Sequence, residues 1–162
     1  MFTVEINNDG IEAGLQRLST QLADTTAVMG RIAKHLAQST EDRFATGKSP
    51  DGVNWAAKSP VTLQAYGARK SNRIDSRPLF GPSGDLHSTI GSDYGVDFAE
   101  ISSARPYAAM MQFGGTRAAF PNLWGDIPAR PFFGISEADE ASVLDIIAEA
   151  LSAGVSAASN QT

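Results

Sequence analysis

Residues able to support acid–base, nucleophilic or metal chemistry are few in this chain and lie far apart. The two histidines, His35 and His87, have no partner at a metal-ligand spacing such as His-x-x-x-His. Ser83 lies between glycines without forming a Gly-x-Ser-x-Gly nucleophile elbow, so we expect it to cap a short helix. The chain has no cysteine, which excludes disulfides and thiolate chemistry. We therefore predict that the protein is not an enzyme and has no cofactor or metal site.

Charge is unevenly distributed along the 162 residues. Residues 43–77 contain seven basic and two acidic side chains, for a formal +5, whereas the whole chain carries −5. The last 26 residues contain five acids and no base, which favours a solvated or pore-facing surface over a catalytic carboxylate pair. A net negative charge argues against DNA binding through the global field. A basic segment and an acidic end favour head-to-tail docking between copies, and two solvated surfaces are the alternative.

Apolar periodicity predicts amphipathic helices near both ends of the chain. A first helix is predicted over 10–23 with Asp9 as its cap, and a second from 24–26 to Gly47. A last helix is predicted to begin at a capping box of Ser136 and Asp139, and 156–162 is expected to fray. The apolar stripes of the three helices are Ile11, Leu15, Leu18, Leu22; Val28, Ile32, Leu36, Phe44; and Val143, Ile146, Ile147, Ala150, Leu151.

The middle of the chain is rich in glycine and proline and shows less periodicity. Residues 47–82 are predicted to form an extended arm, with one helical turn at 58–63. The shorter elements expected elsewhere are a strand at 3–6, a helix at 83–90, a hairpin of 89–92 and 96–101 around a turn at 93–95, a helix at 106–113 and a loop at 116–134. No apolar run approaches the ~20 residues that span a bilayer. We therefore predict a single α+β domain over 1–162: a small antiparallel sheet, an N-terminal helix pair, a C-terminal helix and a long irregular central arm.

Two tryptophans lie in segments predicted to be loops, Trp55 in the arm and Trp124 in the later loop. Each either packs on its own core or anchors a neighbouring subunit, since Trp is enriched at the energetic centres of interfaces. Arg130 stands between two prolines, and we expect it to form a salt bridge within or between subunits, with phosphate contact as the alternative. The residues expected at subunit or partner interfaces are Trp55, Lys58, Arg69, Lys70, Arg73, Arg77, Trp124 and Arg130.

Several short motifs occur in a fixed order between residues 44 and 134. They are Phe-x-x-Gly-x-x-Pro-x-Gly-x-x-Trp, Ser-Gly-x-Leu, Pro-Tyr-Ala, Gln-Phe-Gly-Gly and Ile-Pro-Ala-Arg-Pro-Phe-Phe-Gly. Together they resemble the phage virion morphogenesis family, found in Mu-like phages and related to tail completion proteins. Met111 departs from the family pattern, where His is frequent, so any chemical role of that His is absent here. The motif residues, interpreted as structural, are Phe44, Gly47, Pro50, Gly52, Trp55, Gly84, Leu86, Tyr107, Gln112, Phe113, Gly114, Pro128, Arg130, Phe132 and Gly134.

The resemblance implies a structural virion protein that acts by assembly in the host cytoplasm. It implies a homo-oligomeric ring, which we expect to be hexameric, at the head-proximal end of the tail or in the neck. Tail tube or sheath proteins and head–tail connector proteins would be its partners, and DNA would pass through it without specific binding. A nucleic-acid-associated or regulatory binding module that uses the basic arm is the alternative. A small hydrolase is a third possibility, for which no nucleophile and base are found.

Overall fold

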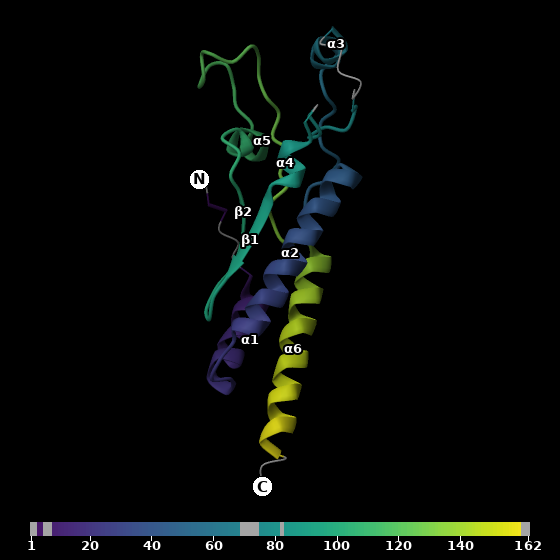
Figure 1. Ribbon diagram of the computed structural model, residues 1–162. Coiled ribbons are helices and arrows are strands. Elements are labelled where there is room, and N and C mark those ends of the chain that lie inside the picture. The colour runs from purple at the N-terminus through teal and green to yellow at the C-terminus, as the bar shows by residue number, and fades with distance from the viewer. Residues whose placement is uncertain (1–2, 5–7, 69–74, 82, 160–162) are drawn as a thin grey trace. The chain divides into compact units, whose positions relative to one another are not determined.

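The computed structural model describes residues 3–4, 8–68, 75–81 and 83–159 (Figure 1). Over these residues the chain forms six helices and one two-stranded antiparallel sheet, which confirms the predicted small α+β fold. The elements are α1 (Asp9–Gln21), α2 (Thr26–Thr46), α3 (Pro60–Ala68), α4 (Asp85–Ser88), β1 (Ile90–Tyr94), β2 (Ala99–Ser103), α5 (Ala108–Phe113) and α6 (Glu137–Ser159).

The chain divides into two compact units, and each is built from separate stretches of sequence. Unit 1 comprises Met1–Val4, Thr40–Gly91 and Ser103–Gly134, and unit 2 comprises Glu5–Ser39, Ser92–Ser102 and Ile135–Thr162. Helix α2 contributes its first two-thirds to unit 2 and its last turns to unit 1. The hairpin likewise contributes residues to both units. That 1–162 forms a single domain stays a prediction.

Unit 2 is built on three helices with apolar stripes. Helix α1 packs against α6, and the three helices α1, α2 and α6 run side by side (Figure 1). The buried core of the unit is Leu18, Val28, Met29, Ile32, Val143 and Ile147, with the remaining stripe residues of α1 and α6 packed around it. Gly14 allows α1 to approach α6 closely, because a Cβ there would lie 3.3 Å from the Ile147 Cδ1. The periodicity of the sequence therefore predicted the correct inward faces.

The first helix begins with a different cap from the one predicted. The side chain of Asn8, and not that of Asp9, accepts a hydrogen bond from the Ile11 amide at 3.0 Å. Asp9 lies in the first turn of α1, where its negative charge is favourable near the positive end of the helix dipole. At α2, Asp24 accepts from the Thr26 amide at 2.9 Å, and hydrogen bonds from Thr26 lower the pKa of the Asp24 carboxyl. The helix ends at Thr46 as predicted, and Gly47 follows with φ +69°.

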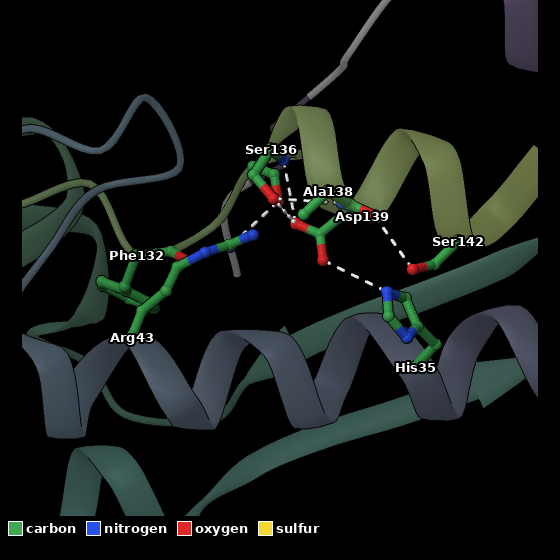
Figure 2. A network of polar contacts seen from close by, with 8 residues as sticks. His35, Arg43, Phe132, Ser136, Ala138, Asp139 and Ser142 are labelled. Atoms are coloured by element: carbon green, nitrogen blue, oxygen red, sulfur yellow. Dashed lines mark hydrogen bonds and ion pairs between the residues drawn. The ribbon is translucent and has the colours of Figure 1, made fainter.

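The last helix begins with the predicted capping box (Figure 2). The Ser136 hydroxyl accepts from the Asp139 amide at 3.1 Å, and Asp139 Oδ2 accepts from the Ser136 amide at 2.9 Å and hydroxyl at 2.7 Å. Asp139 Oδ1 lies 3.2 Å from His35 Nε2, so His35 connects α2 to the first turn of α6. The helix continues through Ser159, so the predicted fraying from 156 is wrong up to that residue, and 160–162 lie outside the described residues.

Replacing Asp139 with Ala is expected to lower the free energy of unfolding of unit 2 by about 2 kcal/mol. The substitution removes a buried carboxylate that accepts from Ser136 and contacts His35. Urea denaturation followed by circular dichroism at 222 nm measures the change. The matched control is Glu137→Ala, an exposed acid in the same turn, which should cost only a few tenths of a kcal/mol. Equal effects of the two substitutions would contradict the capping interpretation.

Unit 1 is centred on aromatic side chains contributed by distant parts of the chain. Phe44 and Phe132 are fully buried with ring centroids 5.4 Å apart, and Trp55, Phe80 and His87 surround Phe44. The Arg43 guanidinium donates to the Phe132 carbonyl oxygen at 2.9 Å (Figure 2). It also donates to the Gly134 carbonyl oxygen at 3.0 Å. The His87 ring lies 5.6 Å from the Phe44 ring and 5.1 Å from the Phe80 ring, so His87 packs in this aromatic cluster.

Several element bounds in the middle of the chain differ from the predictions. The predicted single turn at 58–63 is a nine-residue helix, α3, although it buries no side chain. Helix α4 is shorter than the predicted 83–90, and its cap position is Gly84 at φ +67° without a side-chain bond, so Ser83 as cap is wrong. The hairpin turn falls at 95–98, two residues later than predicted, and α5 begins at Ala108. In the predicted strand at 3–6, Thr3 and Val4 are not in a strand, and 5–6 lie outside the described residues.

Candidate assembly surface

Trp55 packs inside unit 1, which is the alternative that the sequence left open. Its side chain is only 6% exposed, its ring lies edge-on to Phe44 at 5.6 Å, and its Nε1 donates to the Pro131 carbonyl at 2.8 Å. The first part of the predicted arm folds back here, because an antiparallel bridge joins Lys48 to Asn54 and the Trp55 amide donates to the Gly47 carbonyl. Trp55 therefore anchors its own core and offers no exposed surface to a neighbouring subunit.

Arg130 is buried and contacts carbonyl oxygens where a carboxylate was expected. Its Nε donates to the Ala56 carbonyl at 2.7 Å and its Nη2 to the Ala57 carbonyl at 3.0 Å. Burial lowers the pKa of the guanidinium, which nevertheless remains charged at neutral pH. Within the described chain, the Arg130 guanidinium therefore makes charge-assisted hydrogen bonds to the segment that follows Trp55, and a salt bridge to another subunit stays a prediction.

The remaining predicted arm residues are largely held within unit 1. Lys58 Nζ donates to the carbonyl oxygens of Asp75, at 2.6 Å, and Phe80, and burial lowers the pKa of this amine. Arg77 makes a forked ion pair with Asp75, with Nη2 2.5 Å from Oδ2, and lies over the Phe80 ring at 3.6 Å. The hydrogen bond from Arg77 lowers the pKa of the Asp75 carboxyl. Arg69, Lys70 and Arg73 lie outside the described residues.

The motif residues build the framework of unit 1, with Gln112 linking two of its segments. Gln112 is buried; its Oε1 accepts from the amides of Phe132 and Phe133, both at 3.0 Å, and its Nε2 donates to the Phe133 carbonyl at 3.1 Å. Phe44, Trp55, Leu86 and Phe132 are buried, whereas Tyr107 and Phe113 are exposed. The positive-φ glycines among them are Gly47, Gly52, Gly84, Gly114 and Gly134. Pro128 is also exposed, and it follows Ile127, which pairs with Gly115 in an antiparallel bridge.

Replacing Gly114 with Ala is expected to destabilise unit 1 by about 2–4 kcal/mol. Gly114 has φ +71°, and a Cβ there would lie 2.7 Å from both the Ala129 nitrogen and the Ile127 oxygen, which are backbone atoms that cannot move independently. Gly125→Ala is the matched control, since a Cβ at Gly125 meets nothing within 4 Å. Thermal unfolding should show a lower midpoint for Gly114→Ala alone, and a shared shift would refute the steric explanation.

The loop that follows α5 exposes apolar side chains, and backbone hydrogen bonds join its two ends. We call residues 115–127 the bridged loop. Gly115 and Ile127 exchange two backbone hydrogen bonds of 2.9 and 2.8 Å, and Asp126 accepts from the Arg117 amide at 2.7 Å. Trp124 is 95% exposed on this loop and Phe120 is about half exposed. The loop is the green segment that extends beyond α5 in Figure 1. Among the predicted interface residues that the structure describes, Trp124 is almost fully exposed, as an interface role requires.

A second exposed apolar surface lies at the turn of the hairpin in unit 2, and we call residues 92–98 the hairpin tip. Tyr94, Val96 and Phe98 are exposed there, beside the exposed acids Asp93 and Asp97. The Thr25 hydroxyl donates to the Val96 carbonyl, and Gly30 allows the Tyr94 ring to lie against α2. This surface was not predicted, because 93–95 was assigned only as a turn. The available signal was that Tyr94, Val96 and Phe98 recur at every second position, which is the spacing of one face of an extended strand.

The uneven charge of the sequence coincides with the division into units. Unit 1 contains ten Lys and Arg residues against six Asp and Glu, a formal +4, and unit 2 contains three against twelve, a formal −9. The described residues include no cluster of three or more His, Asp or Glu that could hold a metal ion. No described helix is long and apolar enough to cross a membrane. The features of the described residues that could contact another protein are the bridged loop, the hairpin tip and the charged surfaces of the two units.

Comparisons with known proteins agree with this assembly character. The profile of the phage virion morphogenesis family matches residues 6–152. The chain is 35% identical over 146 residues to the putative capsid assembly protein G of Escherichia phage Mu, with 90% of each chain covered. It is 29% identical over 148 residues to the Mu-like prophage FluMu G protein 2 of Haemophilus influenzae, covering 91% of this chain and 94% of the relative. No solved structure matches significantly.

These matches cover nearly the whole of both compact units, and they confirm the resemblance carried by the motifs between residues 44 and 134. They support a structural or assembly role in a bacteriophage over catalysis. The chain belongs to the phage virion morphogenesis family.

Proposed function

We propose that this chain is a structural virion protein that forms a ring at the head-proximal end of the tail or in the neck. There it completes the tail and joins it to the head. The observation that carries the proposal is Trp124, an almost fully exposed tryptophan on a loop with a hydrogen-bonded base. A side chain of this kind at this exposure is typical of a surface that is covered by another protein.

We propose six copies in the ring, because tail tubes are generally six-fold and a closed ring needs one repeated heterologous contact. Tail tube or sheath proteins would lie on one side and connector proteins on the other. DNA would pass through the channel without specific contacts.

The alternative, a nucleic-acid-binding module that uses the basic arm, is less well supported by the contacts of unit 1. Arg43, Lys58 and Arg77 donate hydrogen bonds to carbonyl oxygens or to Asp75 within the unit. These donors are therefore already used inside the chain, where binding to phosphates would need them at the surface. Salt-sensitive DNA binding by the purified chain, without any ring, would favour this alternative.

The proposal is tested by deleting the gene from the phage or prophage that encodes the chain and examining the particles by electron microscopy. We expect DNA-filled heads and separate, unjoined tails, and we expect the chain supplied in trans to restore complete virions. Complete, infectious particles in the deletion strain would overturn the proposal. Loss of late gene expression with no particle parts at all would point to a regulatory protein.

A further inference from the structure

We propose that the bridged loop of one copy docks on the hairpin tip of the next copy, with Trp124 as the anchor. This inference rests on the proposed ring and names the contact that builds it. The occupant of the hairpin tip is thus a second copy of this chain, and the contact is heterologous: two different surfaces of the same chain meet.

The bridged loop has the composition of an interface centre. It carries Trp124 and Phe120 with the exposed cation Arg117, and Trp and Arg are the residue types most enriched at binding hot spots. Arg117 makes no ion pair with any residue that the structure describes. Two backbone hydrogen bonds between Gly115 and Ile127 hold the ends of the loop together in the free chain. The loop therefore loses less conformational entropy when it binds.

The hairpin tip has the complementary character. It exposes Tyr94, Val96 and Phe98 together with Asp93 and Asp97, so an apolar centre is flanked by negative charge. Over the described ranges no Lys or Arg forms an ion pair with either acid. Its backbone is also fixed, because the Thr25 hydroxyl donates to the Val96 carbonyl and Gly95 donates to the Phe98 carbonyl at 2.9 Å.

Charge selects this pairing over the symmetric ones. The bridged loop itself is formally neutral, with Arg117 and Asp126, but it belongs to a unit of formal +4, whereas the tip carries two acids and belongs to a unit of formal −9, so the two surfaces attract. Loop-to-loop contact would bring together two units of formal +4, and tip-to-tip contact would bring together two acidic tips, which disfavours an isologous dimer. A heterologous contact leaves one loop and one tip unfilled until a ring closes. The same chain therefore supplies both halves of every contact.

The test uses two full-length variants that each lose one half of the contact. The loop variant is Arg117→Ser with Trp124→Ala, and the tip variant is Val96→Ser with Asp97→Lys. Each alone should bind other copies at least about 30-fold more weakly than the unmodified chain. A mixture should form a 1:1 complex and nothing larger, because the intact loop of the tip variant fits the intact tip of the loop variant. Native mass spectrometry and analytical ultracentrifugation measure these masses.

The matched control is Val53→Ser with Asp51→Lys, which changes an exposed Val and an exposed Asp outside both surfaces. It should assemble like the unmodified chain, and circular dichroism should show that all three variants keep its unfolding midpoint. Unimpaired assembly of the loop or tip variant would overturn the inference, as would a mixture that stays monomeric while the unmodified chain assembles.

A second measurement tests the same contact in virions, in case the purified chain does not assemble without its partners. The sequence has no cysteine, so Ala118→Cys on the loop and Ser92→Cys at the tip introduce unique thiols at exposed positions. Treating virions that carry the double variant with a short bismaleimide should give a ladder of covalent multimers, and neither single variant should give one. Incorporation into virions without a ladder overturns this contact while the proposed function stands. Absence of the chain from virions overturns both.

Discussion

Replacing Phe44 with Ala should lower the free energy of unfolding of unit 1 by about 3–5 kcal/mol. The ring is fully buried, and its centroid lies 5.4–6.2 Å from the rings of four residues of the same unit, so truncation opens a cavity that fixed neighbours cannot fill. The four neighbours are Trp55, Phe80, His87 and Phe132. An effect of this size is comparable with the whole stability of a small domain.

Urea denaturation followed by tryptophan fluorescence measures this loss. Trp55 lies in the cluster and reports on unit 1, and a Trp124→Phe background removes the signal of the other tryptophan. Phe113→Ala is the control, because this ring is 58% exposed and its truncation should cost less than about 1 kcal/mol. A Phe44→Ala chain with unchanged stability would show that the cluster does not hold unit 1 together.

Replacing Gln112 with Met should destabilise the same unit by about 3–6 kcal/mol. Met conserves much of the side-chain volume but removes the hydrogen bonds that Gln112 makes to three backbone groups: the amides of Phe132 and Phe133 and the carbonyl of Phe133. Each buried group that loses its hydrogen bond costs about 1–3 kcal/mol. The result should be a large loss of stability with little change in packing volume.

The control for this substitution is Gln64→Met on α3, where the side chain is exposed and the cost should be within about 0.5 kcal/mol. Gln112→Glu adds a further check, because it keeps acceptor oxygens for the two amides but loses the donor to the Phe133 carbonyl and buries a charge. Unfolding in urea of all three chains measures the differences. If Gln112→Met and Gln64→Met were equivalent, the hydrogen bonds of Gln112 would not be what fixes the 132–133 segment.

The elements with strong periodicity were predictable from the sequence. The stripes of α1, α2 and α6 lie inward, and the capping box of Ser136 and Asp139 forms as expected, because helix faces and caps depend on local spacing. Gly47 ends α2 for the same reason. The cap of α1 was placed one residue late, since Asn8 and Asp9 are both good caps and only the chain path decides between them.

Long-range contacts were not predictable in the same way. Glycines and prolines suggested an extended arm over 47–82 with one helical turn, yet the Trp55 ring packs against Phe44. Its Nε1 donates to the carbonyl of Pro131, which lies 76 residues further along the chain. Such a contact depends on tertiary structure that leaves no local pattern. The hydrogen bonds from Arg130 to the Ala56 and Ala57 carbonyls could not be predicted either. The flanking prolines indicated that the position of Arg130 is constrained, but the sequence does not show which group it contacts. The hairpin turn begins at residue 95, two residues later than predicted, because β1 continues through Tyr94.

The measurement that bears most directly on the assembly role is a cryo-electron microscopy reconstruction of mature virions with this chain located in the density. We expect a closed ring of identical copies at the junction of head and tail, with the loop that carries Trp124 buried against a neighbouring copy. Virions that are complete and infectious but contain no copy of the chain, or only isolated single copies, would contradict the proposed ring.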